Sequence, residues 1–218
     1  MHRSKIFFIF VLTYLLFFTG DEEKYIKREC LCNVSPELLK YQIHYRITPI
    51  KQEKSMDCWA TVYTMMNSWR IKKHISVHET MVDLGYPWYE YYLNNEGLPA
   101  SQERSFFCKV GLTFEPSANY LISFYKNALG RYGPLWITSG DGFNSHARLM
   151  VGLYGDGSYE NTCLEFIDPK TGKVYCQRGL DFALEFEKEM RFIVDTKMLV
   201  ELRIQVIHWG YFGIKIER

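Results

Sequence analysis

The chain has 218 residues, of which 47% are hydrophobic and 23% charged, a balance typical of one or two globular domains and unlike that of a disordered or fibrous protein. The formal net charge is +1; without Arg3 and Lys5, which lie in a leader-like segment, 24 basic residues face 25 acidic ones. Because no basic excess remains to hold a polyanion, the composition argues against nucleic-acid binding.

The first twenty residues have the pattern of an export signal. A basic start precedes an apolar run over residues 6–18, and acidic residues follow at 21–23. Thirteen helical residues span about 20 Å, less than the roughly 30 Å hydrocarbon core of a bilayer. Residues 1–20 are therefore predicted to be a cleaved signal peptide, with an uncleaved membrane anchor as the alternative. Either reading predicts that the rest of the chain is secreted or periplasmic, and at a membrane only if the anchor is retained.

The first half of the remaining chain is predicted to be mainly helical. Residues 21–48 are interpreted as a lead-in with short elements and as a candidate pro-segment. Hydrophobic spacing and capping signals then predict helices over residues 58–70, between a capping box at Ser76 and Gly85, over residues 100–110, and over about 118–129 between Ser117 and Gly130. The aromatic residues 86–98 are expected to be rich in turns and either to line a substrate groove or to pack.

Short strand-like runs separated by Gly-rich turns dominate the second half. They cover residues 134–138, 147–154, 162–167, 173–176, 191–194, 198–207 and 211–216, with a short helix over 182–189. Helices followed by antiparallel strands predict an α+β fold.

The segment from Gln52 to Cys58 carries the strongest chemical signal. A cysteine in the first turn of a helix lies at the positive end of the helix dipole, which favours the thiolate. The free backbone N–H groups there can stabilise an oxyanion, and a glutamine six residues earlier can supply another amide donor. The competing interpretation is that Cys58 is a buried packing residue beside Trp59. Asp57 is expected to cap the helix that begins at Cys58.

His146 is the best-placed base, because it follows a polar loop and begins the strand predicted over residues 147–154. Pairing that strand with the next one about a turn at Gly157 places His146 opposite Asp168. Side chains opposite one another on paired strands lie within hydrogen-bonding reach, so Asp168 can orient the imidazole. Glu165 is the substitute if the register differs. His44 has no partner at metal-ligand spacing and is interpreted as a packing residue.

The pattern of Gln52 followed by Cys58-Trp59-Ala60 resembles the active-site segment of papain-like cysteine proteases. The later run 133–137, His146-Ala147 and the turn 168–172 resemble the bacterial branch of that family, which includes secreted effector proteases and bacteriocin-processing peptidase domains. The resemblance covers roughly residues 50–172. It implies a helical lobe and an antiparallel β lobe with an active-site cleft between them. Residues 49–218 are interpreted as the papain-like catalytic domain, in which the strands after residue 172 are a C-terminal β extension that the resemblance does not account for.

By the same resemblance Cys58 is the nucleophile, His146 the base, Asp168 the orienting acid and Gln52 an oxyanion-hole donor. The substrate is then a peptide or protein, and the reaction needs no metal or organic cofactor. Two alternatives use the same residues: an amidase of cell-wall peptides or an acyl transferase, and a catalytically inactive papain-like binding module. The target, the cleavage site and the oligomeric state are not determined by the sequence.

The chain has six cysteines; if Cys58 is catalytic, five remain, and at least one of these is unpaired. Cys163 and Cys176 flank a predicted turn and are expected to be able to pair. Cys30 and Cys32 are too close together to bond each other easily. They also lack a second pair of ligands at the spacing of a zinc site, so zinc is not expected.

Overall fold

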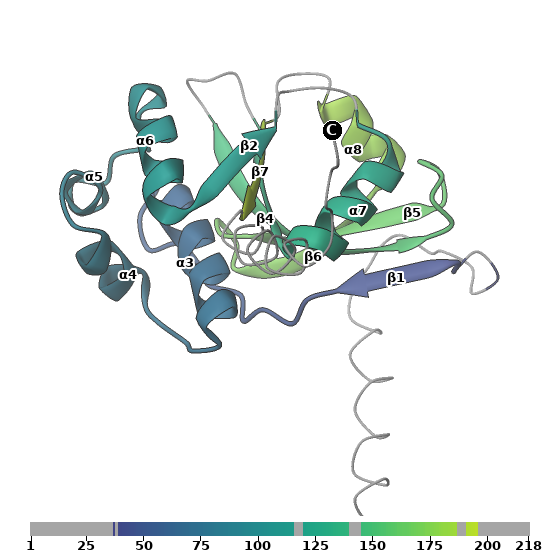
Figure 1. Ribbon diagram of the computed structural model, residues 1–218, viewed down its shortest axis with the longest axis horizontal. Helices are drawn as coiled ribbons and strands as arrows, with labels where there is room; N and C mark the ends of the chain where they lie inside the picture. The colour runs from purple at the N-terminus through teal and green to yellow at the C-terminus, as the bar shows by residue number, and fades with distance from the viewer. Residues whose placement is uncertain (1–36, 38, 116–119, 140–144, 187–190, 196–218) are drawn as a thin grey trace, which may run out of the picture. The chain divides into compact units, whose positions relative to one another are not determined.

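The computed structural model describes residue 37 and residues 39–115, 120–139, 145–186 and 191–195. The helices are α3 (Cys58–Ile71), α4 (Val77–Leu84), α5 (Trp88–Leu93), α6 (Ala100–Val110), α7 (Ile122–Tyr132) and α8 (Gly179–Phe186). The strands are β1 (Tyr41–His44), β2 (Leu112–Glu115), β3 (Leu135–Ser139), β4 (His146–Gly155), β5 (Thr162–Asp168), β6 (Lys173–Arg178) and β7 (Arg191–Asp195). Helices α3 to α6 gather beside the sheet as a helical lobe (Figure 1). The predicted α+β fold is confirmed.

Local signals place three helices of this lobe as predicted. α3 begins at Cys58, and α4 opens with a complete capping box, in which Ser76 Oγ accepts the Glu79 N–H and the Glu79 carboxylate accepts the Ser76 N–H. α6 ends at Gly111, whose left-handed backbone suits a glycine. The expected turn-rich stretch is in part a helix, α5, whose Trp88 and Tyr92 are buried in the core of the lobe.

α7 departs from its predicted bounds. Residues 116–119, where the cap at Ser117 was expected, lie outside the described residues. The expected stop at Gly130 is wrong, since Gly130 lies inside the helix, which ends at Gly133. Gly133 has φ +82°, and an added Cβ there would lie 2.3 Å from the indole of Trp69, so this position needs a glycine twice over.

The described strands form one antiparallel sheet in the order β2-β7-β3-β4-β5-β6. β1 also pairs with β4, alongside its second half, whereas β3 pairs with its first half. β1 lies inside the predicted lead-in segment. Its partners in β4 are far along the chain: the nearest pair in sequence, His44 and Gly152, is 108 positions apart. β2 was not expected, and the strands predicted over 198–207 and 211–216 lie outside the described residues.

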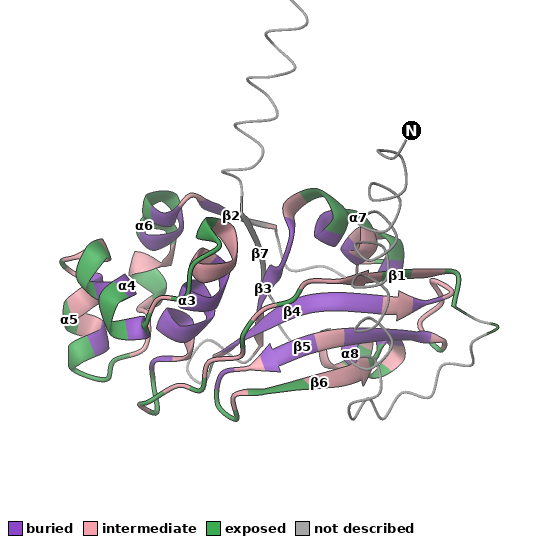
Figure 2. Ribbon diagram, turned by 90° about the horizontal axis from the view of Figure 1, so that it is seen from below, coloured by how far each residue is buried: buried purple, intermediate pink, exposed green. Residues whose placement is uncertain are grey.

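β4 is the strand around which both hydrophobic cores are built (Figure 2). Ala147, Leu149 and Val151 pack into the core of the helical lobe. Met150 and Leu153 pack into a second core that contains α7 and Phe182 of α8. Because successive side chains of a strand point to opposite faces, a strand buried on both sides is apolar along most of its length. This position holds the beginning of β4, and with it His146, against both lobes.

The described residues contain no helix that is both long and apolar enough to cross a bilayer. The predicted signal peptide or anchor at residues 1–20 lies outside them.

Candidate active site

Cys58 lies where the helical lobe meets the sheet. It is the first residue of α3, half-buried, and a free thiol. The backbone N–H of Ala147, the residue after His146, donates to its sulfur. The N-terminus of α3 and the beginning of β4 therefore converge on one sulfur atom.

The ionisation of Cys58 differs from the sequence-based expectation. Burial raises the pKa of the thiol above its ordinary value, and the negative charge of Asp57 raises it further. The N–H groups of Ala147, Trp59 and Cys58 itself lower the pKa, as the start of a helix should, but burial outweighs them. The N–H groups at the helix start act in the expected direction, toward the thiolate, but the net effect on the pKa of the Cys58 thiol is upward.

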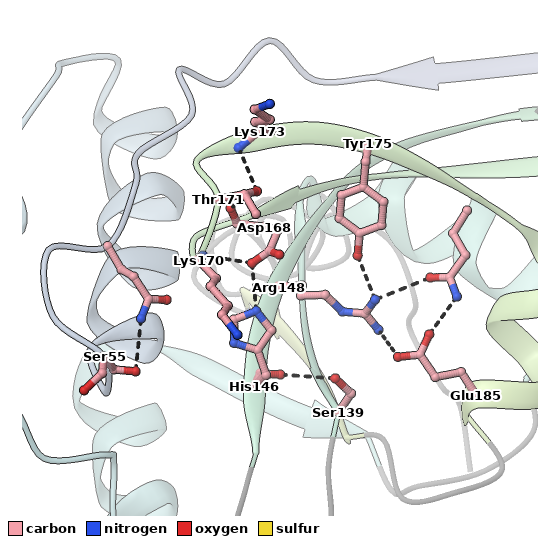
Figure 3. Close-up of polar contacts among 12 residues, drawn as sticks. Ser55, Ser139, His146, Arg148, Asp168, Lys170, Thr171, Lys173, Tyr175 and Glu185 are labelled. Atoms are coloured by element: carbon pink, nitrogen blue, oxygen red, sulfur yellow. Dashed lines mark hydrogen bonds and ion pairs between the residues drawn. The ribbon is translucent and has the colours of Figure 1, made fainter. Parts of the chain in front are cut away.

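His146 and Asp168 form a direct hydrogen bond, with 2.8 Å between His146 Nε2 and Asp168 Oδ1 (Figure 3). The same carboxylate oxygen accepts the Lys170 N–H at 2.8 Å. The turn after β5 thus fixes the Asp168 carboxylate, which in turn is hydrogen-bonded to one ring nitrogen of His146. The other nitrogen, Nδ1, is left for proton transfer.

The register used to predict this contact is wrong, although the two residues do meet. β4 pairs with β5 through Leu149 and Ile167, two positions away from a ladder centred on Gly157. His146 therefore has no Cα partner in the described part of β5. It reaches Asp168 as a diagonal neighbour, a distance that an imidazole and a carboxylate can span together.

Glu165, the substitute acid, belongs to a different pair. Its carboxylate lies 2.7 Å from Nδ1 of His44, so His44 is not merely a packing residue. The two side chains meet across Gly152, which is the Cα partner of both. A Cβ at Gly152 would lie 2.5 Å from the Glu165 carboxylate, so the glycine makes room for the pair. Glu165 is thereby excluded as the orienting acid in this structure.

Gln52 lies beside both the cysteine and the aspartate segments. Its backbone N–H donates to the carbonyl of Pro169, the residue after Asp168, at 2.8 Å. Its side-chain nitrogen donates to the carbonyls of Lys54 at 2.7 Å and Ser55 at 3.1 Å. In this conformation the amide therefore holds the loop before Cys58, and its role as an oxyanion donor stays a prediction.

The prediction that the Asp57 side chain caps α3 is wrong. It occupies the N-cap position but makes no side-chain hydrogen bond to the helix. Instead Oδ2 accepts the Lys54 N–H at 3.3 Å, and Oδ1 is buried without a hydrogen-bond partner. The residue is fully buried, and burial raises the pKa of its carboxyl. A carboxyl so placed disfavours a second negative charge on the adjacent sulfur.

Comparison with known proteins decides the family. The model of the family described as "Papain-like cysteine protease AvrRpt2" matches residues 40–184, more than half of the chain. The chain belongs to this papain-like cysteine protease family. No curated protein matches the sequence. A solved structure entitled "Crystal structure of a double glycine motif protease from AMS/PCAT transporter in complex with the leader peptide" is 17% identical, with a TM-score of 0.43, covering 71% of this chain and 97% of that one.

The papain-like fold expected from the sequence is confirmed by the family, and the chain is a cysteine-type peptidase. The family match begins at residue 40 and so includes β1, nine positions before the predicted start of the catalytic domain. The boundary at residue 49 and the pro-segment remain predictions.

A polar cluster next to the histidine of this papain-like protease was not predicted from the sequence (Figure 3). Arg148, two positions after His146 on β4, is 7% exposed. Its guanidinium donates to Tyr175 Oη at 2.7 Å and to Glu185 Oε1 at 3.0 Å, while Gln177 donates to the other Glu185 oxygen at 2.6 Å. An arginine inside an otherwise apolar strand was the available signal, since such a charge must be paired. The cluster ties α8 to β4 and β6.

The predicted disulfide between Cys163 and Cys176 is wrong. Cys163 is buried and forms no disulfide, whereas Cys176 is disulfide-bonded. The register explains why they do not pair: Cys163 lies opposite Arg178, and Cys176 lies opposite Glu165. Cys30 and Cys32 lie outside the described residues. Within the described ranges, no group of three or more metal-ligating side chains is gathered.

Proposed function

We propose that the protein is an exported cysteine peptidase that hydrolyses peptide bonds with Cys58 as nucleophile, His146 as base and Asp168 as orienting acid. The observation that carries this proposal is the convergence of two pairs: the Ala147 N–H on the Cys58 sulfur, and the 2.8 Å hydrogen bond between His146 and Asp168. A nucleophile, a base and a group orienting that base are the parts that covalent acyl transfer needs.

The proposed reaction starts from the neutral thiol. As the Cys58 sulfur forms a bond to the peptide carbonyl carbon, its proton moves to Nδ1 of His146. The carbonyl oxygen becomes an oxyanion, which the Cys58 N–H and a Gln52 amide proton stabilise. For Gln52 this requires releasing the Lys54 or the Ser55 carbonyl.

Collapse of this intermediate breaks the C–N bond, and the proton held by His146 goes to the leaving amine. Water then attacks the thioester while losing a proton to His146. That proton returns to the sulfur as the C–S bond breaks, which releases the carboxylic acid and restores the thiol. Asp168 holds the imidazole orientation and stabilises its cationic form in both halves.

Substitution of the nucleophile tests the proposal. Cys58→Ala is expected to abolish hydrolysis of a denatured protein substrate while leaving the thermal unfolding midpoint close to that of the wild type. Cys108→Ala is the matched control, because Cys108 is an exposed free thiol outside the site. A peptidyl electrophile, followed by mass mapping, is expected to modify Cys58 rather than Cys108. Turnover that persists in Cys58→Ala would contradict the proposal.

Export is supported by the oxidised state of Cys176, since structural disulfides persist mainly outside the cytoplasm. The basic and apolar pattern of residues 1–20 supports it independently.

A further inference from the structure

Residues 54–56, which lead into Asp57 and Cys58, are held by the C-terminal end of α5 and the turn that follows it. Asn95 contacts two of them: its Oδ1 accepts the Met56 N–H at 3.0 Å, and its Nδ2 donates to Ser55 Oγ at 3.1 Å. Asn95 has φ +57°, a left-handed backbone that asparagine tolerates better than most residues. The conformation turns its side-chain amide to serve as donor and acceptor at once.

Residues on both sides of Asn95 also contact the segment around Cys58. We call these contacts, together with those of Asn95, the α5 clamp. Lys54 Nζ donates to the carbonyls of Tyr92 at 2.8 Å and Leu93 at 3.1 Å, at the C-terminal end of α5, where a cation is favoured. On the other side of the nucleophile, the buried Trp59 donates from Nε1 to the Glu96 carbonyl at 3.1 Å. The α5 turn therefore reaches residues both before and after Cys58.

We propose that Asn95 is a positioning residue of the peptidase: it fixes the backbone of residues 55–56 so that the Cys58 N–H is aimed at the oxyanion. The proposal rests on the proposed function. Asn95 contacts neither the sulfur nor the imidazole, so it acts only through the chain that leads into α3.

The peptide groups of the residues before Cys58 set the direction of the Cys58 N–H. Contacts that fix this segment therefore also fix the direction of that N–H. Two side-chain amides hold the segment from different elements. Gln52 takes the carbonyls of Lys54 and Ser55, and Asn95 takes the Met56 N–H and the Ser55 hydroxyl. Donors contribute to transition-state stabilisation only if they are oriented before the charge forms. Without the Asn95 side chain, the Met56 N–H and the Ser55 hydroxyl lose their partners in the α5 turn, and only the contacts of Lys54 and Trp59 still tie the segment to it.

Asn95→Gly is the sharpest test, because glycine adopts the same left-handed backbone without strain and removes only the side-chain contacts. A peptide aldehyde reports on the oxyanion site: the Cys58 sulfur adds to its carbonyl carbon, and the thiol proton ends on the new hydroxyl oxygen. Iodoacetamide alkylates the same sulfur with loss of iodide and forms no oxyanion. We expect Asn95→Gly to weaken aldehyde binding and to lower kcat about tenfold, a fraction of the loss of a whole oxyanion donor. The rate of Cys58 alkylation by iodoacetamide, measured by mass mapping, is expected to stay within twofold of the wild type.

Three variants separate this role from general destabilisation. Lys72→Gly places a glycine at a second left-handed non-glycine position among the described residues, and Asn94→Ala changes the exposed side chain next to Asn95. Both variants are expected to bind the aldehyde as the wild type does. Asn95→Asp keeps an acceptor for the Met56 N–H and is expected to recover part of the loss. Equal aldehyde binding by the wild type and Asn95→Gly would overturn the clamp while leaving the triad intact. An active Cys58→Ala variant would instead overturn the proposed function itself.

Discussion

Groups around Cys58 act on its ionisation in opposite directions. Burial and the Asp57 carboxylate favour the neutral thiol, whereas the N–H groups of Ala147 and Trp59 favour the thiolate. Of these, the carboxylate is the one that a single isosteric substitution can neutralise. Asparagine has nearly the same shape as aspartate. Its oxygen can still accept the Lys54 N–H, and its nitrogen can replace Oδ1, which is buried without a hydrogen-bond partner.

Asp57→Asn is expected to lower the pKa of the Cys58 thiol, because it removes a negative charge next to the thiolate. The pH profile of Cys58 alkylation by iodoacetamide should shift to lower pH. Asp83→Asn, an exposed substitution on α4, is the control and should leave the profile in place. A profile that stays in place or moves to higher pH in Asp57→Asn would contradict this account.

The same substitution has a consequence for stability. Because burial raises the pKa of Asp57 in the folded state, its contribution to stability is fully present below the unfolded-state pKa of about 3.9 and is lost as the pH rises through the folded-state value. Asp57→Asn should therefore reduce the decline in the free energy of unfolding over that pH range. Urea denaturation at a series of pH values measures it.

Among the elements, β1 ties the N-terminal part of the described chain to both lobes. Its four residues pair with the end of β4. The next residue, Tyr45, donates from its hydroxyl to the Leu129 carbonyl of α7 at 2.6 Å and stacks edge-on against Trp69 of α3. These contacts make β1 part of the folded domain.

A chain that starts at residue 49 is expected to be less stable than one that starts at residue 37. It loses several main-chain hydrogen bonds to β4, each contributing about 0.5–1.5 kcal/mol, and it leaves Glu165 without His44. The unfolding midpoint should fall by on the order of 5–10 °C, which differential scanning calorimetry can measure. Equal midpoints for the two chains would show that the domain begins at residue 49.

Sequence patterns predicted elements well where the signals were local. α6 lies at its predicted residues because an apolar helical pattern ends at a glycine next to it in the chain. α7 was displaced because Gly130 looked like a stop although the chain ends the helix at Gly133, against Trp69 of another helix. β1 and β2 were missed because four-residue strands are specified by partners far along the chain.

The candidate site divides in the same way. Cys58 was predicted from a helix start and a neighbouring glutamine, both local patterns. The meeting of His146 with Asp168 was predicted from a hairpin whose true register differs by two positions, and Asn95 had no signal. Its importance depends on a left-handed turn and on contacts about 40 positions away in the chain.

At the scale of the whole molecule, the disulfide at Cys176 and the leader-like pattern of residues 1–20 bear on the compartment in which the chain folds. Cys163, which is buried and forms no disulfide, and the disulfide-bonded Cys176 lie in neighbouring strands. A disulfide at Cys176 is expected of a protein that folds in an oxidising compartment, and burial shields the thiol of Cys163 from oxidation.

When the full chain is produced with its N-terminus intact in a bacterial host, the recovered protein is expected to lack about the first twenty residues. Cys176 is expected to resist alkylation until a reductant is added. Intact-mass measurement and peptide mapping check both points. A full-length chain in the membrane fraction would indicate the anchor, and a full-length cytosolic chain with a reactive Cys176 would contradict export.

The placement of β4 between two cores has a consequence for dividing the molecule. A fragment with only the helices α3 to α6 would display to water the apolar surface that Ala147, Leu149 and Val151 cover. A fragment with only the strands would expose the opposite side of the same contact. Each piece would lose the apolar packing across this contact, and with it much of its stability. We therefore expect the helices that carry Cys58 and the strands that carry His146 to unfold together in one cooperative transition.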